Sequence, residues 1–271
     1  MLTLENDSLA VSILDPDADQ DKFGTRYCTG GYIFQITDAQ DGELLSGPTF
    51  SHTFDAFNGQ GIPDAFNKTP LRDKADDTSD SLVIGIGMCD LLADTVTDFC
   101  SWSIEERGTS VTMTTAQTCG NFSLELERTV SLTGRTIRSS NLLRNTGKRP
   151  IPVNWFPHPF YPQLPDDDEL CKFNVPVSFP ENSGFELREN GFIARKSWPW
   201  VDNGHYQALD HNAQTNLVIF QKHPKLGLVA ATCSFVPCFF PIWGNANTFS
   251  WEPFFERTVA PRQSTQWWID Y

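Results

Sequence analysis

A chain of 271 residues with 21 Phe, 8 Trp and 39% hydrophobic residues has enough apolar surface for an extended core, which excludes a disordered protein and a disulfide-dependent one. Its net charge of −14 and pI near 4.6 argue against nucleic acid and anionic membrane surfaces as partners, because like charges repel. No stretch reaches the roughly 18 apolar residues that a membrane span requires.

The first residues and the cysteines predict a cytoplasmic protein. Glu5 and Asp7 precede any apolar run, and the segment lacks the basic start and hydrophobic stretch of a signal peptide. The seven cysteines are scattered and form no CxxC pair, which favours buried thiols in a reducing compartment. We therefore expect no metal site and no other cofactor.

The first strand signals are short, at residues 32–37 and 81–88. In the second, Gly85 and Gly87 resemble part of a nucleotide-binding loop, but Asp90 replaces the third glycine and no helix follows. We interpret these glycines as easing a tight turn or a crowded strand.

The clearest β-signal lies at residues 122–132, after two predicted strands at 102–106 and 111–116. Apolar residues from Phe122 to Leu132 alternate with polar ones, and Arg128 is the only break in the pattern. A helix would scatter these apolar residues around its circumference, so the alternation predicts a half-buried strand. Thr133 and Gly134 then turn the chain into a strand at 136–145.

The C-terminal third continues the same organisation. Strands are predicted at 217–221 and 228–233, with a hairpin connection at 223–227, and a closing strand at 264–271. No amphipathic helix, repeat or change in composition interrupts the series. The sequence thus predicts an all-β fold, a large antiparallel β-sandwich, as a single domain over residues 1–271.

Two segments, 152–162 and 249–257, each place an ionisable residue among aromatic and proline residues: His158 in the first and Glu252 in the second. Low polarity raises the pKa of a carboxyl group and makes it a better base near neutral pH. Aromatic faces suit stacking on a sugar ring. The structural alternative is that both segments plug the core and that His158 only binds a backbone carbonyl.

Short motifs in a fixed order resemble the aldose 1-epimerase (galactose mutarotase) superfamily. They are GQGIP (59–63), NTG (145–147), HPF (158–160), WGN (243–245) and WEP (251–253). The first is similar to the GGIP stretch of the hexose-6-phosphate mutarotase branch. The resemblance implies a β-supersandwich and a small-molecule carbohydrate as ligand.

The resemblance also implies residue roles. Glu252 is the base that takes a proton from the anomeric hydroxyl, and His158 is the acid that protonates the ring oxygen. Asp202 and, more weakly, Gln60 are implied as substrate-binding residues. Asn58 and Gly59 stand where the phosphate-using branch has an arginine, so we expect a non-phosphorylated sugar. The second histidine of the family has no clear match.

Two alternatives stay open at this point. The chain could be a non-catalytic carbohydrate-binding or sensing protein on the same fold. It could also be a glycosidase or lyase that uses Glu252 with Glu256 or Asp202, which requires two carboxyl groups about 5–10 Å apart.

Overall fold

The computed structural model describes residues 1–47, 59–67, 70–72, 80–200 and 204–271. Almost all regular structure in these ranges is β-strand, and a short 3-10 turn, Gln20–Lys22, is the one helical element among them. None of the described residues belongs to a helix with the length and hydrophobicity of a membrane span. The predicted all-β class is confirmed.

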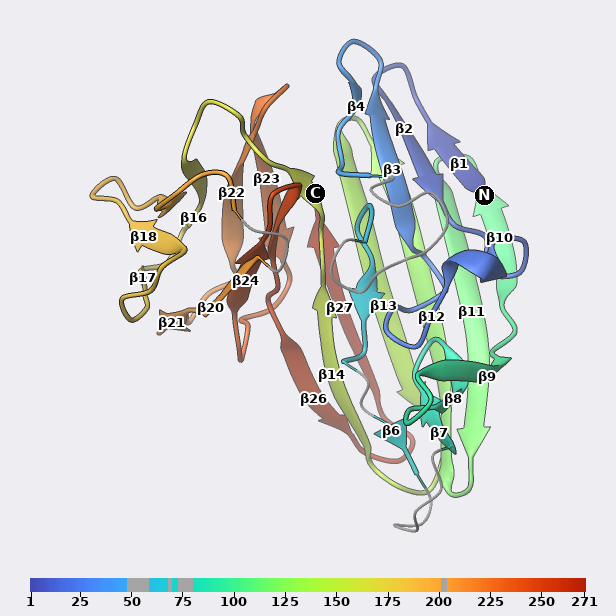
Figure 1. The fold of residues 1–271 in the computed structure, drawn as a ribbon. Helices are drawn as coiled ribbons and strands as arrows, with labels where there is room; N and C mark the ends of the chain where they lie inside the picture. The colour runs from blue at the N-terminus through green and yellow to red at the C-terminus, as the bar shows by residue number, and fades with distance from the viewer. Residues whose placement is uncertain (48–58, 68–69, 73–79, 201–203) are drawn as a thin grey trace.

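The largest sheet has ten strands, and every neighbouring pair is antiparallel (Figure 1). In spatial order they are β10 (Ser103–Arg107), β11 (Ser110–Cys119), β12 (Phe122–Thr133), β13 (Thr136–Asn145), β27 (Ser264–Asp270), β23 (Gly227–Cys233), β22 (Val218–His223), β16 (Glu169–Phe173), β19 (Ile193–Arg195) and β18 (Phe185–Leu187).

Smaller sheets form the second layer. They are β1 (Leu2–Glu5), β2 (Leu9–Ile13), β3 (Ile33–Asp38) and β4 (Gly42–Glu43); β26 (Phe255–Val259), β14 (Ile151–Pro157) and β5 (Asp64–Ala65); β6 (Pro70–Leu71), β7 (Asp80–Val83), β8 (Gly87–Asp90) and β9 (Thr95–Phe99); β15 (Tyr161–Pro162), β25 (Thr248–Trp251), β24 (Pro241–Gly244) and β20 (His205–Ala208); and the pair β17 (Val177–Ser178) and β21 (Asp210–His211).

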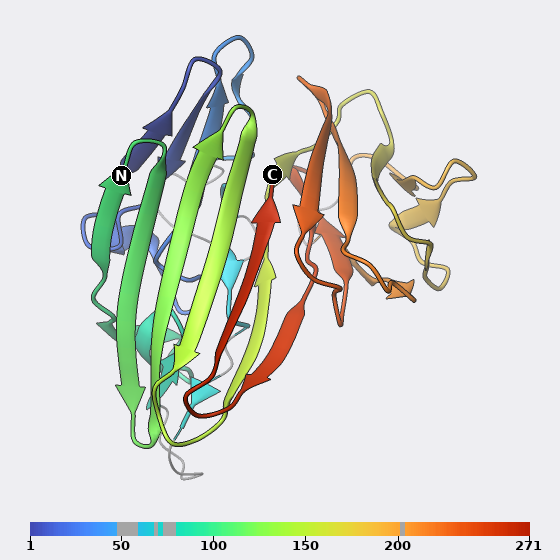
Figure 2. The same cartoon turned by 180° about the vertical axis from the view of Figure 1, so that it is seen from behind.

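The two opposite views show the smaller sheets on one face of the ten-stranded sheet (Figures 1 and 2). Apolar side chains from both layers form one continuous core that includes Leu4 of β1, Trp155 of β14 and Ile269 of β27. Burial of this surface, at roughly 25 cal/mol per Å², is the main force that holds the layers together. The predicted antiparallel β-sandwich is confirmed.

Alternation in β12 matches the prediction from residues 122–132. Phe122, Leu124 and Leu126 are buried, and the residues between them are partly exposed. Arg128 does not break the alternation in space, because it is also buried, with only 1% of its surface exposed. The pattern therefore placed this arginine on the core face of the sheet.

One strand prediction needs correction. Residues 81–88 are not one strand: β7 and β8 form a hairpin whose turn contains Ile84 to Ile86, so the glycines there make a tight turn. The strand predicted at 264–271 is confirmed as β27 (Ser264–Asp270). β27 lies inside the ten-stranded sheet, between β13 and β23, where both of its sides can pair.

Gly85 in this turn cannot be replaced without strain. Its φ is +74°, and a Cβ atom there would lie 2.4 Å from the Sγ of buried Cys28. We expect Gly85→Ala to lower the free energy of unfolding by about 1–2 kcal/mol through backbone strain and by roughly 1–3 kcal/mol more through overpacking.

The matched control is Gly134→Ala, at φ +57° with nothing within 4 Å of the added Cβ, which carries the backbone strain alone. Urea denaturation measures both losses. Equal losses in the two variants would contradict the tight contact with Cys28.

A buried ion pair joins the two layers. Arg128 of β12 pairs with Asp64 of β5, and the side chains are 1% and 2% exposed. Arg128 Nη2 also donates to Ser139 Oγ at 3.2 Å and to the Gly31 carbonyl at 3.4 Å. Burial raises the pKa of Asp64, and the charge of Arg128 limits that rise. The pair fixes β5, and the GQGIP segment before it, against the large sheet.

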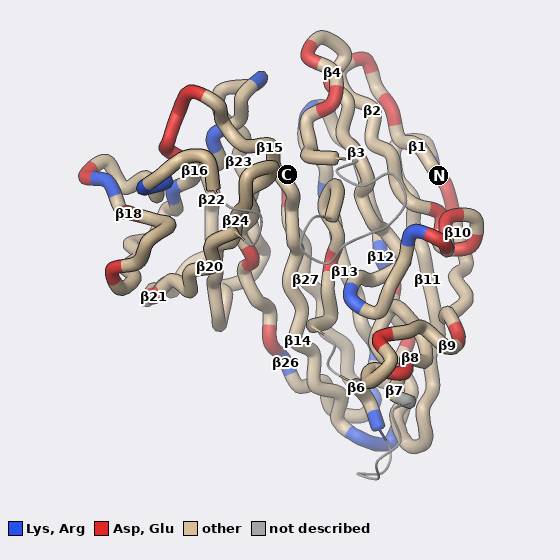
Figure 3. The backbone as a smooth tube through the Cα atoms, in the orientation of Figure 1, with Lys and Arg blue, Asp and Glu red and all other residues tan. Residues whose placement is uncertain are grey.

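Acidic residues are spread over the periphery (Figure 3). They lie in loops and along outer strands rather than on one face. The net charge of −14 therefore acts as a general negative field that keeps molecules apart. All seven cysteines are free thiols, and Cys238 is the exposed one.

Candidate active site

His158 lies directly after β14, where the chain is held by the GQGIP segment. Its backbone N–H donates to the Pro63 carbonyl at 2.8 Å, and the Phe160 N–H donates to the Gly61 carbonyl at the same distance. β14 also pairs with β5 at Phe156 and Pro157. These backbone hydrogen bonds fix the main chain at His158 and so limit where its imidazole can lie.

Glu252 comes from a different part of the chain. It follows β25, and its backbone N–H donates to the Pro241 carbonyl at 2.9 Å, which extends the pairing of β25 with β24. The residue is 6% exposed. Its Oε1 lies 3.4 Å from His158 Nε2. The fold thus brings together two ionisable groups that the sequence could not place relative to each other.

The imidazole of His158 is held on several sides. Ser250 Oγ lies 3.0 Å from Nδ1. The Phe160 ring stacks on the imidazole with centroids 4.3 Å apart and planes 14° apart. Tyr27 and Trp243 approach it edge-on at 6.3 Å and 5.9 Å. With Nδ1 engaged by Ser250, Nε2 is the nitrogen that faces Glu252, and the ring has one defined orientation.

Burial shifts the pKa values of the two groups in opposite directions. It raises the pKa of Glu252 to about 7, and the positive charge of Arg26 opposes this rise. Burial lowers the pKa of His158 well below its ordinary value, and Arg26 adds to that effect. Near neutral pH the pair therefore holds about one proton, which the two groups can share across 3.4 Å.

Gln60, one of the two residues predicted for substrate binding, makes its side-chain hydrogen bond away from this pair. Gln60 is buried, and its side-chain amide donates to the Phe34 carbonyl at 3.4 Å. The Tyr32 hydroxyl donates to the Gln60 backbone carbonyl at 2.7 Å. These contacts give Gln60 a role in packing the GQGIP segment. Asp202 lies outside the described residues.

Glu256, the rival carboxylate, has a separate environment. It lies on β26 with its side chain exposed, and its Oε1 accepts a hydrogen bond from Asn154 Nδ2 at 2.6 Å. Glu252 instead contacts His158 in the interior. The two carboxylates therefore have different partners, Asn154 for Glu256 and His158 for Glu252.

Sequence reasoning missed Ser250 and Arg26. Ser250 lies two residues before Glu252, so strand alternation could have placed both side chains on one face. Arg26 carries no local signal, since it precedes any predicted strand and reaches the site only through the fold. In the described part of the chain, no three His, Cys, Asp or Glu side chains are grouped to hold a metal ion.

Comparison with known proteins identifies the fold. No protein-family model and no curated protein matches the chain. A galactose mutarotase related enzyme from Lactobacillus acidophilus is structurally similar, with a TM-score of 0.64 and 13% identity over 99% of this chain and 96% of that chain.

Two further solved structures are also similar to this chain. A galactose mutarotase-like protein from Lactobacillus casei has a TM-score of 0.59 and 14% identity, covering 99% of this chain and 98% of its own. A galactose mutarotase-like protein from Clostridium acetobutylicum has a TM-score of 0.57 and 12% identity, covering 99% and 94%.

Proposed function

We propose that this chain, which has the fold of the galactose mutarotase-like structures, interconverts the anomers of a non-phosphorylated sugar by acid–base ring opening. The similarity to these structures confirms the expected β-supersandwich fold. The proposed activity is supported by the geometry of the candidate active site. One observation carries it: a buried histidine and a buried glutamate lie 3.4 Å apart, and their pKa values are shifted in opposite directions.

The reaction moves two protons. Glu252 takes the proton of the anomeric hydroxyl while His158 gives a proton to the ring oxygen, and the bond between C1 and the ring oxygen breaks. The open-chain aldehyde rotates about its C1–C2 bond. Closure on the opposite face returns both protons, so the enzyme ends in its starting state.

The number of protons bound by His158 and Glu252 together determines how the rate of anomer exchange depends on pH. Catalysis requires one proton on the pair. The pKa order places that proton on Glu252 at rest, so it must move to His158 to leave Glu252 ionised, and Ser250 can accept from Nδ1–H in that form. Above the Glu252 pKa of about 7 the pair loses this proton and the acid is missing. Below the depressed pKa of His158 it holds two protons and the base is missing.

The sugar is expected to be neutral or acidic. The arginine of the phosphate-using branch is absent from the GQGIP segment, and a net charge of −14 disfavours a dianionic phosphate. Arg26 acts electrostatically on both His158 and Glu252, so its positive charge lies near the proposed reaction centre. Such a charge suits the carboxylate of a uronic acid as well as a hydroxyl group.

The test is saturation-transfer NMR of anomer exchange over a panel of hexoses and uronic acids. We expect one class of sugar to exchange faster with the wild type, and His158→Asn to slow that exchange by roughly 10²–10⁴-fold. Glu256→Gln is the matched control, since Glu256 is exposed and bonded to Asn154, and it should leave the rate unchanged.

Two outcomes would count against the proposal. If no sugar exchanges faster with the wild type than with Glu252→Gln, the chain is not an isomerase of these sugars. Binding of a sugar without any exchange would instead support the carbohydrate-sensing alternative.

A further inference from the structure

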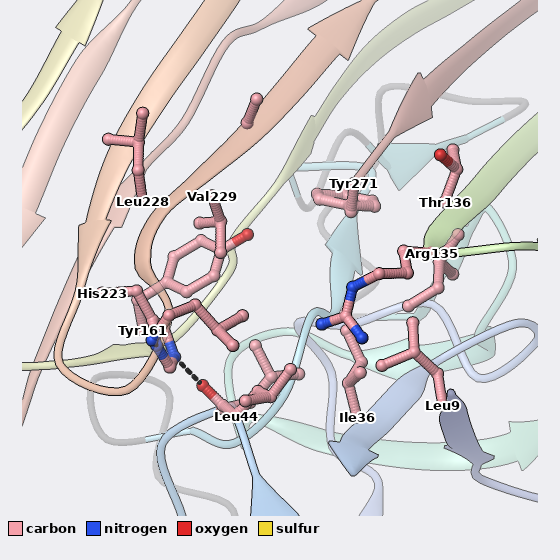
Figure 4. Close-up of a pocket in the computed structure, with 14 residues that line it drawn as sticks. Leu9, Ile36, Leu44, Arg135, Thr136, Tyr161, His223, Leu228, Val229 and Tyr271 are labelled. Carbon is pink, nitrogen blue, oxygen red and sulfur yellow. Dashed lines mark hydrogen bonds between the residues drawn. The ribbon is translucent and has the colours of Figure 1, made fainter. Parts of the chain in front are cut away.

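A pocket of about 380 Å³ lies between the region of β2–β4 and the β22–β23 hairpin (Figure 4). One wall comes from β2 to β4 and the residues after them, and the opposite wall comes from the β22–β23 hairpin. Neither His158 nor Glu252 lines it. Its volume is within the roughly 300–1,000 Å³ of small-molecule sites.

The pocket lies on the other side of the chain from the imidazole. Phe160 stacks on His158, whereas the next residue, Tyr161, lines the pocket and packs against Trp251. Successive side chains of an extended segment point to opposite sides. The pocket is therefore a second space, separated from the proposed active site by the layer that contains β15 and β25.

Most of its walls are aliphatic. Leu9, Ile36 and Leu44 lie on one side, and Leu226 and Val229 on the other. Leu228 at the hairpin is 48% exposed, so apolar surface continues to the mouth of the pocket. These aliphatic side chains suit the apolar body of a ligand, while hydrogen-bonding groups elsewhere in the lining suit its polar end.

The pocket is preformed, because its two walls are tied together. His223 Nε2 lies 2.7 Å from the Leu44 carbonyl, and its Nδ1 accepts from the backbone N–H groups of Lys225 and Leu226, each at 3.2 Å. The Lys225 ammonium donates to the Glu43 carbonyl at 2.6 Å. These bonds join the β22–β23 turn to the segment around β4, so a ligand need not order either wall.

Two polar groups face the apolar space. Arg135, from the turn between β12 and β13, extends its guanidinium into the pocket, and the Tyr161 hydroxyl points into the same space (Figure 4). Arg135 uses Nη2 to pair with Asp38 Oδ2 at 2.6 Å. The Asp38 carboxylate also accepts from the backbone N–H groups of Gln40 and Asp41, which anchors the pair at the rim.

The remaining guanidinium N–H groups of Arg135 can take a second anion, since a guanidinium has five donors in a planar fork. Burial raises the pKa of Tyr161, so its hydroxyl stays protonated and able to donate. A cation and a hydroxyl donor above aliphatic walls match one ligand chemistry. We propose that this pocket binds a small amphiphilic carboxylate, with its carboxylate on Arg135 and Tyr161 and its apolar body between Leu44 and Val229.

The test compares octanoate with its uncharged counterpart, 1-octanol, by ¹H–¹⁵N NMR titration of the full chain. Octanoate is expected to bind more tightly than octanol and to shift the amide signals of β22–β23 and of residues 44–45. Arg135→Met should weaken octanoate binding at least about tenfold, because it removes the charged hydrogen-bond donor for the carboxylate. It should leave octanol binding within about twofold.

Three further variants test a charge outside the pocket, the Tyr161 hydroxyl and the space inside the pocket separately. Arg144→Met is the control, since Arg144 makes a similar surface pair with Glu125 at 2.6 Å and does not line the pocket. Tyr161→Phe keeps the ring and the Arg135–Asp38 pair intact and should weaken octanoate binding by a smaller factor. Val229→Trp should abolish binding of both ligands by filling the pocket.

The proposal is overturned if octanoate causes no shifts around the pocket, or if it binds no tighter than octanol and Arg135→Met changes nothing. The proposal is also overturned if Tyr161→Phe is folded and binds octanoate with unchanged affinity. Anomer exchange does not enter this test, so its outcome is independent of the proposed function.

Discussion

Arg128→Met is expected to lower the free energy of unfolding by about 3–5 kcal/mol, the largest loss from a single side chain that we predict. Arg128 and Asp64 are almost fully buried, and the arginine is the only cation paired with this carboxylate among the described residues. Removing it leaves Asp64 charged in the core or forces it to take up a proton. Urea denaturation at neutral pH measures the loss.

Asp64 supplies the internal control. In the double variant Arg128→Met/Asp64→Leu no charge is stranded, and most of the lost stability should return, because apolar replacements of buried ion pairs are often neutral or stabilising. Arg144→Met removes a half-exposed surface pair and should lose no more than about 1 kcal/mol. If Arg128→Met were no more harmful than Arg144→Met, the buried pair would not hold the layers.

Glu252→Gln is expected to abolish anomer exchange and also to stabilise the fold above neutral pH. Exchange should fall by roughly 10²–10⁴-fold, because the amide cannot accept the anomeric proton. Burial raises the pKa of Glu252 from 4.5 to about 7, so the folded state is favoured below pH 4.5 and loses that advantage as pH rises through 7. At pH 8 a neutral residue should therefore gain up to about 3 kcal/mol.

The pH dependence of the stability gained by Glu252→Gln tests whether burial of the charged carboxylate is its cause. The free energies of unfolding of wild type and Glu252→Gln should differ at pH 8 and converge below pH 4.5, where Glu252 is protonated in both the folded and the unfolded state. A gain of the same size at both pH values would mean that burial of charge is not its cause. Glu256→Gln, at an exposed carboxyl, should show little change at either pH.

Much of the architecture was predictable because period-two alternation is a local property. Phe122 to Leu132 gave the strand, its buried face and its partner at 136–145 directly, and all are confirmed in β12 and β13. The order of the short motifs also led to the right fold. Arg128 was visible as the one polar residue on the apolar face, although its partner Asp64 was not.

What the sequence could not provide depends on distant contacts. The 3.4 Å approach of His158 to Glu252 comes from the pairing of β14 with β5 and of β25 with β24, and no spacing rule encodes it. Gln60 fits the motif, yet its side chain bonds Phe34 because the GQGIP segment packs against β3. β1 and β2 were too short and too mixed in composition to give a strand signal.

The position of β27 has a consequence for biosynthesis. β10 to β13 form a meander of neighbouring strands, which can pair as soon as they leave the ribosome. β22 and β23 can form their hairpin in the same way. The two groups are joined in the large sheet through β27, which follows both in the chain. A nascent chain therefore carries two unjoined sheet edges until residues 264–270 emerge, and during this interval unpaired strand edges are exposed that could pair with other chains.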